Sequence, residues 1–176
     1  MKKLTRITFC VSLLLLGTTL IGCQPIQPNS VGQMENCSDT DKIAVVQHSI
    51  DAIQQEDAAK ASVDFSKDGR LWFDNVPEFD TTSGEFKVNG TFEATGPDVE
   101  HLMAAIISAV ENIQLSDVSV DGDLYKARAT VTSPFYRDAG FPSDTVIQDY
   151  TIKFQGCKII DWKGTYPAET LKSVKK

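Results

Sequence analysis

Two acidic side chains beside aromatic ones are the residues of this chain best suited to chemistry. Asp74 ends the run Leu71-Trp72-Phe73, and Asp161 directly precedes Trp162. Aromatic neighbours can desolvate a carboxyl group and raise its pKa, which suits general acid–base catalysis. A plainer interpretation is favoured for each: Asp74 caps or turns the chain, and Asp161 faces water if Trp162 faces the core. Asp74 and Asp161 are therefore the catalytic candidates, each with a structural alternative.

Several other kinds of site lack the residues they need. The two histidines, His48 and His101, are far apart and fall on the outer faces of expected helices, which argues against a metal cluster or a Ser-His-Asp triad. No glycine-rich phosphate loop or paired-cysteine zinc motif occurs. The 176 residues include 17 basic and 24 acidic ones, a net charge of −7 that argues against nucleic-acid binding. We expect no metal, no cofactor and no nucleic acid.

The elements that must position these residues follow from apolar periodicity. They are, in chain order, a helix from about 39, a helical stretch at 56–65 that Gly69 ends, strands at 70–74 and 86–94, a helix from 98 to about 112, and strands at 114–120, 124–133, 144–155 and 157–165. Asp39 or Thr40 can cap the first helix, whose buried stripe is expected to be Ile43, Val46, Ile50 and Ile53. The dipeptide Asn89-Gly90 is interpreted as a bulge in one strand rather than a hairpin turn.

This order of elements resembles the nuclear transport factor 2-like (NTF2-like) superfamily, including its SnoaL-like members. The stretches that carry the likeness are 52–59, 91–97, 118–131 and 158–162, and the resemblance spans about residues 39 to 166. It implies an α+β fold, in which a cone-shaped, curved antiparallel sheet packs against three helices.

The resemblance also implies an apolar pocket between the sheet and the helices. Such pockets bind small molecules, and enzymatic members place acids or histidines in them for proton transfer. In this sequence the expected ligand-binding residues are Trp72, Tyr125, Gln148 and Tyr150. Tyr125 and Gln148 are polar members of otherwise apolar strand faces, and Asp161 lies where some SnoaL-like cyclases carry their acid.

The connection between residues 134 and 143 is unusually aromatic for a loop. It contains Phe135, Tyr136 and Phe141 together with proline and glycine. These side chains can cover the pocket or bind a partner, or they can fold back over the open end of the sheet.

The N-terminus has the features of a lipoprotein export signal. A basic start, Met1 to Arg6, precedes an apolar run that is short for a membrane span. Leu20-Ile21-Gly22-Cys23 resembles the lipobox of bacterial lipoproteins, which implies cleavage before Cys23 and its acylation. The alternative is a short membrane anchor. We expect a lipid-anchored protein of the bacterial cell envelope, on the outer membrane facing the periplasm if the cell is Gram-negative, because Gln24 rather than Asp follows Cys23.

Such processing would leave Cys37 and Cys157 as the cysteines available for pairing. One disulfide is favoured over two free thiols in an oxidising compartment. By chain-entropy estimates, a disulfide that closes a loop of this length stabilises the folded chain by about 4 to 5 kcal/mol. Removing residues 1–22 removes three basic residues and no acid, so the net charge changes from −7 to −10. The expected organisation is a signal at 1–22, a tether at 23–37, one domain at 38–168 and a tail at 169–176.

The favoured function is binding of a small apolar ligand or a protein partner without chemistry. One alternative is a cofactor-free isomerase, cyclase or dehydratase of SnoaL-like type that uses Asp74 or Asp161. Another is a structural lipoprotein that forms a homodimer through its sheet.

Overall fold

The structure is a computed structural model that describes residues 37–80 and 85–174. The expected signal, Cys23 and the tether up to residue 36 lie outside the described residues. No helix in the described part of the chain has the length and apolar character needed to cross a bilayer.

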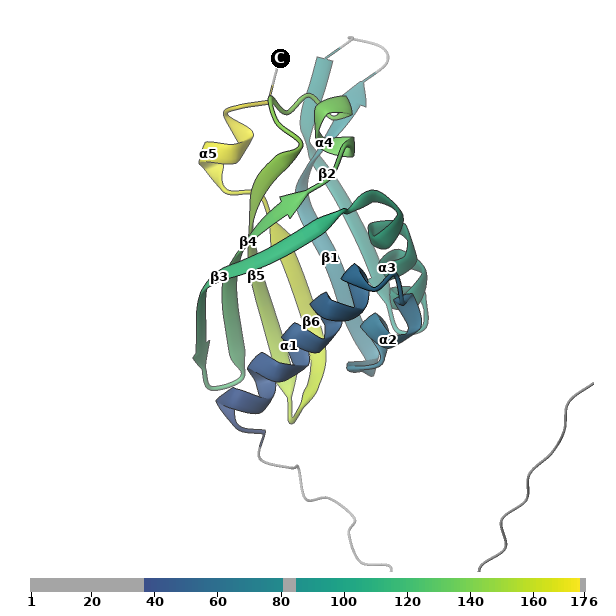
Figure 1. The fold of residues 1–176 in the computed structure, drawn as a ribbon, viewed down its shortest axis with the longest axis vertical. Coiled ribbons are helices and arrows are strands. Elements are labelled where there is room, and N and C mark those ends of the chain that lie inside the picture. Colours follow the sequence, from purple (N-terminus) through teal and green to yellow (C-terminus); the bar gives the residue numbers. More distant parts are fainter. Residues whose placement is uncertain (1–36, 81–84, 175–176) are drawn as a thin grey trace, which may run out of the picture. The chain divides into compact units, whose positions relative to one another are not determined.

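In the described residues, α1 and α2 come first and are followed by pairs of strands separated by single helices (Figure 1). The helices are α1 (Asp39–Gln54), α2 (Ala58–Ser62), α3 (Asp98–Ala109), α4 (Phe135–Asp138) and α5 (Ala168–Leu171). The strands are β1 (Phe65–Asp80), β2 (Glu85–Thr95), β3 (Asn112–Asp121), β4 (Leu124–Thr132), β5 (Thr145–Gln155) and β6 (Lys158–Thr165).

The strands form one curved sheet in the order β2-β1-β6-β5-β4-β3. All neighbouring strands are antiparallel except β1 and β6, which are parallel. Helix α1 contacts β3 and α2, while α3 contacts β1 and β2, so α1 and α3 cover one face of the sheet (Figure 1). The predicted fold class is confirmed, and the β1–β6 pair makes the sheet mixed rather than purely antiparallel.

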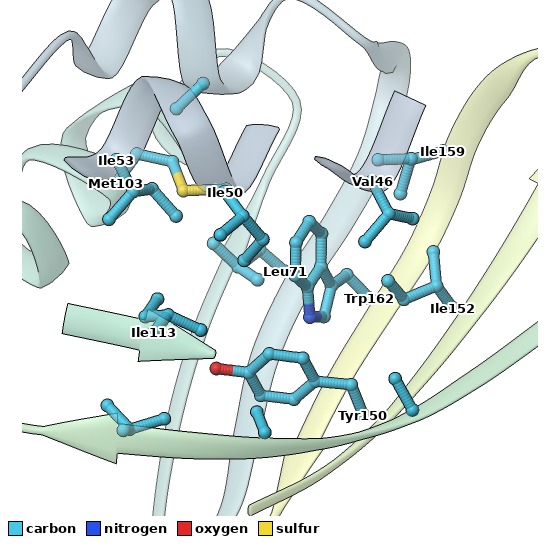
Figure 2. Close-up of a cluster of buried hydrophobic side chains, with 14 of the residues drawn as sticks. Val46, Ile50, Ile53, Leu71, Met103, Ile113, Tyr150, Ile152, Ile159 and Trp162 are labelled. Carbon is cyan, nitrogen blue, oxygen red and sulfur yellow. The ribbon is translucent and has the colours of Figure 1, made fainter. Parts of the chain in front are cut away.

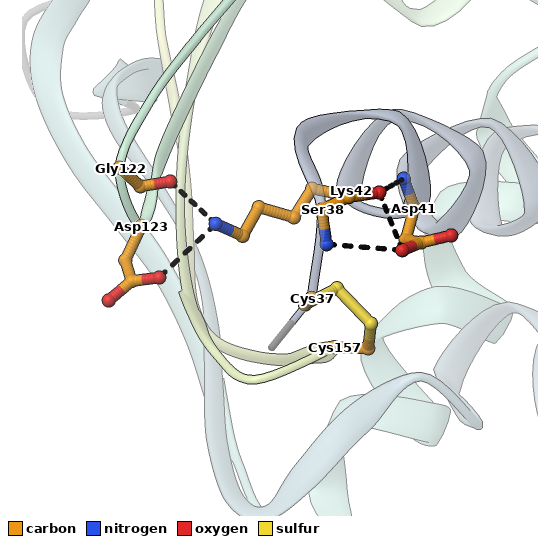
Figure 3. The surroundings of a disulfide bond; sticks show 7 residues. All are labelled: Cys37, Ser38, Asp41, Lys42, Gly122, Asp123 and Cys157. Carbon is orange, nitrogen blue, oxygen red and sulfur yellow. Dashed lines mark hydrogen bonds and ion pairs between the residues drawn. A yellow bond between two sulfur atoms is a disulfide. The ribbon is translucent and has the colours of Figure 1, made fainter. Parts of the chain in front are cut away.

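Helix α1 has its N-cap at Ser38 rather than at Asp39 or Thr40, and it buries a different first residue than expected. Ser38 is the N-cap and forms a capping box with Asp41. Ile43 is 41% exposed, whereas Lys42 is only 4% exposed. The Lys42 ammonium donates to the Gly122 carbonyl at 2.6 Å, and the turn between β3 and β4 covers the side chain (Figure 3). The prediction that Ile43 is buried was wrong because this turn packs against the Lys42 side of the helix.

The helix expected at 56–65 is confined to the five residues of α2. Phe65 already belongs to β1, and Gly69 lies within that strand rather than ending a helix. A Cβ atom on Gly69 would lie 2.8 Å from the Ile159 carbonyl oxygen. The glycine is therefore needed where β1 approaches β6 closely, and the helix-stop interpretation was wrong.

Strand β2 is continuous and bulged, as predicted. Val76 pairs with Gly90 and Pro77 with Val88, which leaves one extra residue at Asn89. A second irregularity lies on β1 between Phe73 and Val76, where Asn75 has a φ of 58°. The sequence did not indicate this second bulge, which lets Phe73 and Val76 face the same side of the sheet despite their odd spacing.

The core lies between the sheet and the helices. Val46 and Ile50 of α1 are buried beside sheet residues that include Leu71 (Figure 2). Trp162 of β6 contacts Tyr150 edge-to-face, with ring centroids 5.6 Å apart. Phe65 stacks on Trp162 at 6.1 Å. These aromatic contacts hold the Tyr150 ring in place at the edge of the core.

A disulfide joins Cys37 to Cys157 across 120 residues (Figure 3). It ties the start of α1 to the turn between β5 and β6, and the predicted pairing is confirmed. At the other end of the chain, Thr170 of α5 is buried and donates to the Ile147 carbonyl at 3.3 Å. The chain thus continues to pack on the domain beyond the predicted boundary at residue 168.

Candidate functional site

A cavity of about 240 Å³ lies between α3, α4 and the helix-covered face of the sheet. Its wall is mostly aliphatic and aromatic. The lining residues are Phe73, Val76, Phe92, Leu102, Ala105, Ile106, Ala109, Val110, Ile113, Val131, Ser133, Phe135, Tyr136, Gln148, Tyr150 and Tyr166. None of these described lining residues carries a charge at neutral pH, so the cavity suits an uncharged molecule.

The polar groups in the wall mostly bind one another. Gln148 Nε2 donates to the Tyr136 hydroxyl at 3.1 Å, and the Tyr136 ring contacts the Tyr166 ring edge-to-face at 6.3 Å. Ser133 Oγ donates to the Ala109 carbonyl and accepts from the Phe135 amide at 3.2 Å. Gln148, Tyr136 and Ser133 therefore each have a hydrogen-bond partner within the protein.

Three tyrosine hydroxyls in the wall remain protonated at neutral pH. Burial raises the pKa of Tyr136 and Tyr150 above the ordinary value of 10.0. Burial also raises the pKa of Tyr166, although hydrogen bonds from Tyr136 and Gln148 act in the opposite direction. The wall thus presents neutral hydroxyl groups rather than tyrosinates.

Two exposed aromatic side chains lie at the edge of the cavity. Phe92 of β2 is 49% exposed and Phe135 of α4 is 45% exposed, and both line it. Next to Phe135, Tyr136 is buried, and its ring contacts Phe141 edge-to-face at 5.5 Å. The aromatic loop therefore folds back onto the sheet and also supplies part of the cavity wall, while binding of a partner by this loop stays a prediction.

The structure brings together two of the four expected ligand-binding residues. Gln148 and Tyr150 alternate along β5 and both line the cavity. Tyr125 is only 1% exposed but does not line it, because it lies at the start of β4 and Val131, near the end of β4, reaches the cavity instead. Burial raises the pKa of Tyr125 to about 12. Tyr125 is therefore a core residue.

The placement of Trp72 in the pocket also needs correction. Leu71 is buried and Phe73 lines the cavity, so alternation directs Trp72 to the opposite face of the sheet. There the Arg70 guanidinium lies 4.2 Å and the Lys163 ammonium 4.3 Å from the centre of its ring. Its indole Nε1 donates to Asp161 at 3.0 Å.

Both catalytic candidates belong to this outer cluster. Asp161 alternates with the buried Trp162 and accepts the indole hydrogen bond of Trp72. Asp74 lies 3.4 Å from the Lys163 ammonium and accepts from the Asn75 amide at 2.9 Å. Neither carboxylate lines the cavity. Strand alternation thus supports the structural alternative for each residue.

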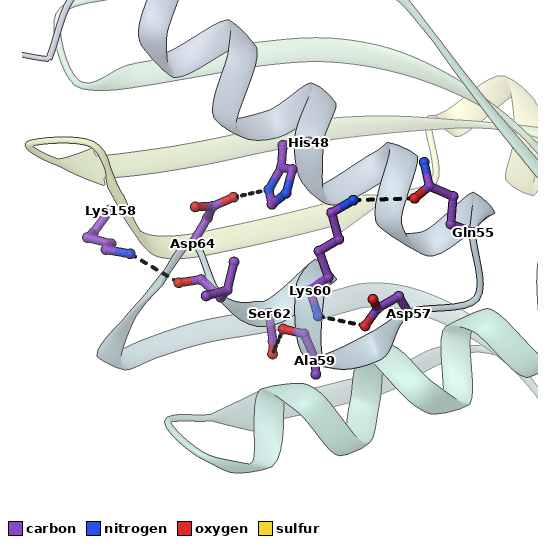
Figure 4. A network of polar contacts seen from close by, with 9 residues as sticks. His48, Gln55, Asp57, Ala59, Lys60, Ser62, Asp64 and Lys158 are labelled. Carbon is purple, nitrogen blue, oxygen red and sulfur yellow. Dashed lines mark hydrogen bonds and ion pairs between the residues drawn. The ribbon is translucent and has the colours of Figure 1, made fainter. Parts of the chain in front are cut away.

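The remaining titratable groups form separate surface contacts. His48 Nδ1 lies 2.5 Å from an Asp64 carboxylate oxygen (Figure 4), while His101 is 88% exposed. Cys37, Asp41 and Cys157 are the one grouping of potential metal ligands among residues 37–80 and 85–174. Because the two sulfur atoms are bonded to each other, neither is available as a thiolate.

Sequence reasoning did not place several lining residues in the pocket. Tyr136 and Phe135 lie in the loop that was singled out as aromatic, so that signal could have placed them. Tyr166 follows β6 directly, and no pattern in the sequence linked it to Gln148. The small residues of α3 that line the cavity, Ala105 and Ala109, also gave no signal.

Neither a protein-family profile nor a curated protein sequence matches this chain. Solved structures match in fold. A protein with a cystatin-like fold from Methylobium petroleophilum is 13% identical, with a TM-score of 0.56 over 76% of this chain and 80% of that one. An LEH-like epoxide hydrolase from Mycobacterium tuberculosis is 15% identical, with a TM-score of 0.52 over 77% of this chain and 90% of that one.

An NTF2-like protein from Burkholderia pseudomallei is 16% identical, with a TM-score of 0.50 over 77% of this chain and 98% of that one. The chain has the NTF2-like fold. At these identities the likeness establishes the fold alone, because one fold supports many unrelated functions. The function of this NTF2-like domain must be argued from its own cavity.

Proposed function

We propose that this domain binds a small, uncharged and largely apolar molecule in its cavity. The observation that carries the proposal is a cavity of about 240 Å³ whose described lining residues are apolar or neutral. The desolvation cost of a charged group in such a site would exceed any electrostatic attraction, because no opposite charge lines the cavity. An apolar molecule gains affinity from the surface that it removes from water.

The volume limits the size of the molecule. An apolar protein cavity of roughly 150 Å³ can bind benzene, which corresponds to about 25 Å³ for each non-hydrogen atom. By that ratio, a cavity of about 240 Å³ holds about ten non-hydrogen atoms. Naphthalene has this size and is a suitable probe.

The test is naphthalene binding to the full chain, measured by calorimetry against a blank of the same detergent and buffer. Ala109 lines the cavity, whereas Ala104 of the same helix is exposed and does not. We expect one binding site in the wild-type chain, loss of binding in Ala109→Trp, and unchanged binding in Ala104→Trp. Circular dichroism checks that both variants stay folded. Equal naphthalene binding by the two variants would contradict the proposal.

The acid-dependent enzyme alternative is not proposed, because neither Asp74 nor Asp161 lines the cavity. Their partners are Lys163 and the Trp72 indole on the other face of the sheet.

We also propose that the chain is an exported lipoprotein anchored through Cys23. The support is the lipobox-like sequence around Cys23 together with the Cys37–Cys157 disulfide, a bond that persists mainly in oxidising compartments. In a bacterial host, the membrane-bound protein should lack residues 1–22 and carry acyl groups by intact mass, and Cys23→Ser should abolish both changes. A mass that retains residues 1–22 without acyl groups would contradict this proposal.

A further inference from the structure

The Tyr150 hydroxyl stands apart from the other polar groups of the cavity wall. Tyr150 is 3% exposed and lines the cavity, yet no described residue forms a hydrogen bond with its hydroxyl. Figure 2 shows this hydroxyl directed away from β5 toward Ile113, another lining residue. Because this hydroxyl faces the cavity and has no partner among the described residues, its donor is available to a ligand that carries an acceptor.

The neighbouring polar groups form hydrogen bonds with partners other than Tyr150. Gln148 donates to Tyr136, and Ser133 donates to the Ala109 carbonyl. The Tyr150 ring is also fixed, because it packs edge-to-face on the buried Trp162. The hydroxyl is therefore held at the cavity wall rather than free to turn toward solvent.

We propose that the ligand carries one neutral oxygen acceptor, a carbonyl or ether oxygen, which accepts a hydrogen bond from the Tyr150 hydroxyl. This inference rests on the proposed binding function and narrows its ligand to a compact ketone, ester, lactone or ether. Burial raises the pKa of Tyr150, so the hydroxyl keeps its proton and acts as a donor. A carboxylate ligand fits less well, because no cationic side chain is among the described lining residues.

Two probes of nearly the same shape separate this inference from general apolar binding. α-Tetralone and tetralin share a carbon skeleton of the size that the cavity holds and differ by the carbonyl oxygen. Their affinities are measured by calorimetry for the full chain and for Tyr150→Phe, which removes the hydroxyl alone. Tyr125→Phe is the matched control, because it removes a buried hydroxyl that does not line the cavity.

We expect Tyr150→Phe to weaken α-tetralone binding about fivefold, as a neutral hydrogen bond requires, and to leave tetralin binding unchanged. Tyr125→Phe should leave both affinities unchanged. If the ratio of α-tetralone affinity to tetralin affinity is the same in Tyr150→Phe as in the wild-type chain, the inference is overturned. This includes the case in which both affinities fall equally. The proposed function would still stand. Failure of both probes to bind the wild-type chain overturns the proposed function and the inference with it.

Discussion

Raising the pH above 10 is expected to unfold the domain cooperatively, because all four tyrosines of the chain are buried. Tyr125, Tyr136, Tyr150 and Tyr166 are each at most 5% exposed. Burial is the main cause that raises the pKa of each tyrosine, and it raises the pKa of Tyr125 to about 12. The folded chain therefore keeps these hydroxyl groups protonated at a pH where the unfolded chain loses their protons.

The sign and size of the effect follow from linkage. The stabilising contribution is fully present below the unfolded pKa of about 10 and is lost as the pH rises toward the folded values. Each tyrosine that ionises only in the unfolded chain costs about 1.4 kcal/mol for each pH unit above 10. Four such groups remove about 5 kcal/mol by pH 11, which is comparable to the whole stability of a small domain.

The assay follows tyrosinate absorbance at 295 nm and far-ultraviolet circular dichroism in parallel between pH 8 and 12.5. We expect little tyrosinate below the transition and a joint change in both signals as the domain unfolds. Phe135→Tyr is the control, because position 135 is 45% exposed and a tyrosine there should titrate near pH 10 before unfolding. A gradual ionisation of all four wild-type tyrosines near pH 10 with unchanged circular dichroism would refute the reasoning.

Two further predictions concern stability. Replacing Cys37 and Cys157 together by serine should lower the free energy of unfolding, measured in urea, by about 5 kcal/mol, because the disulfide closes a 120-residue loop. A loss below about 1 kcal/mol would contradict the chain-entropy argument. Gly164→Ala should cost about 1 to 3 kcal/mol, because the added Cβ meets the ring of Phe73 in the cavity wall. Its naphthalene affinity should fall as well, and an unchanged melting temperature and affinity would show that this ring moves freely.

Long periodic segments of the sequence predicted the fold, whereas features that depend on contacts between distant segments could not be predicted. The stripe Val46, Ile50 and Ile53 placed α1 correctly, whereas Lys42 is buried only because a turn about 80 residues later accepts its hydrogen bond. The bulge at Asn89 was predicted from local turn chemistry. The role of Gly69 was not, since it depends on the parallel pairing of β1 with β6.

The site residues could be predicted where the alternation of side chains along one strand shows which of them face the cavity. Gln148 and Tyr150 share a face of β5, and that face lines the cavity. Trp72 was misplaced because the local sequence does not show that Arg70 and Lys163 pack against its ring on the outer face of the sheet. Tyr166 was missed because its contact with Tyr136 joins residues 30 apart in sequence.

A crystal structure of the full chain grown with naphthalene tests the central claim most directly. The account predicts density for one naphthalene molecule inside the cavity, in contact with Ile106, Ile113 and Val131. A cavity filled by ordered water or by rearranged side chains, with naphthalene absent or bound only at the surface, would contradict it.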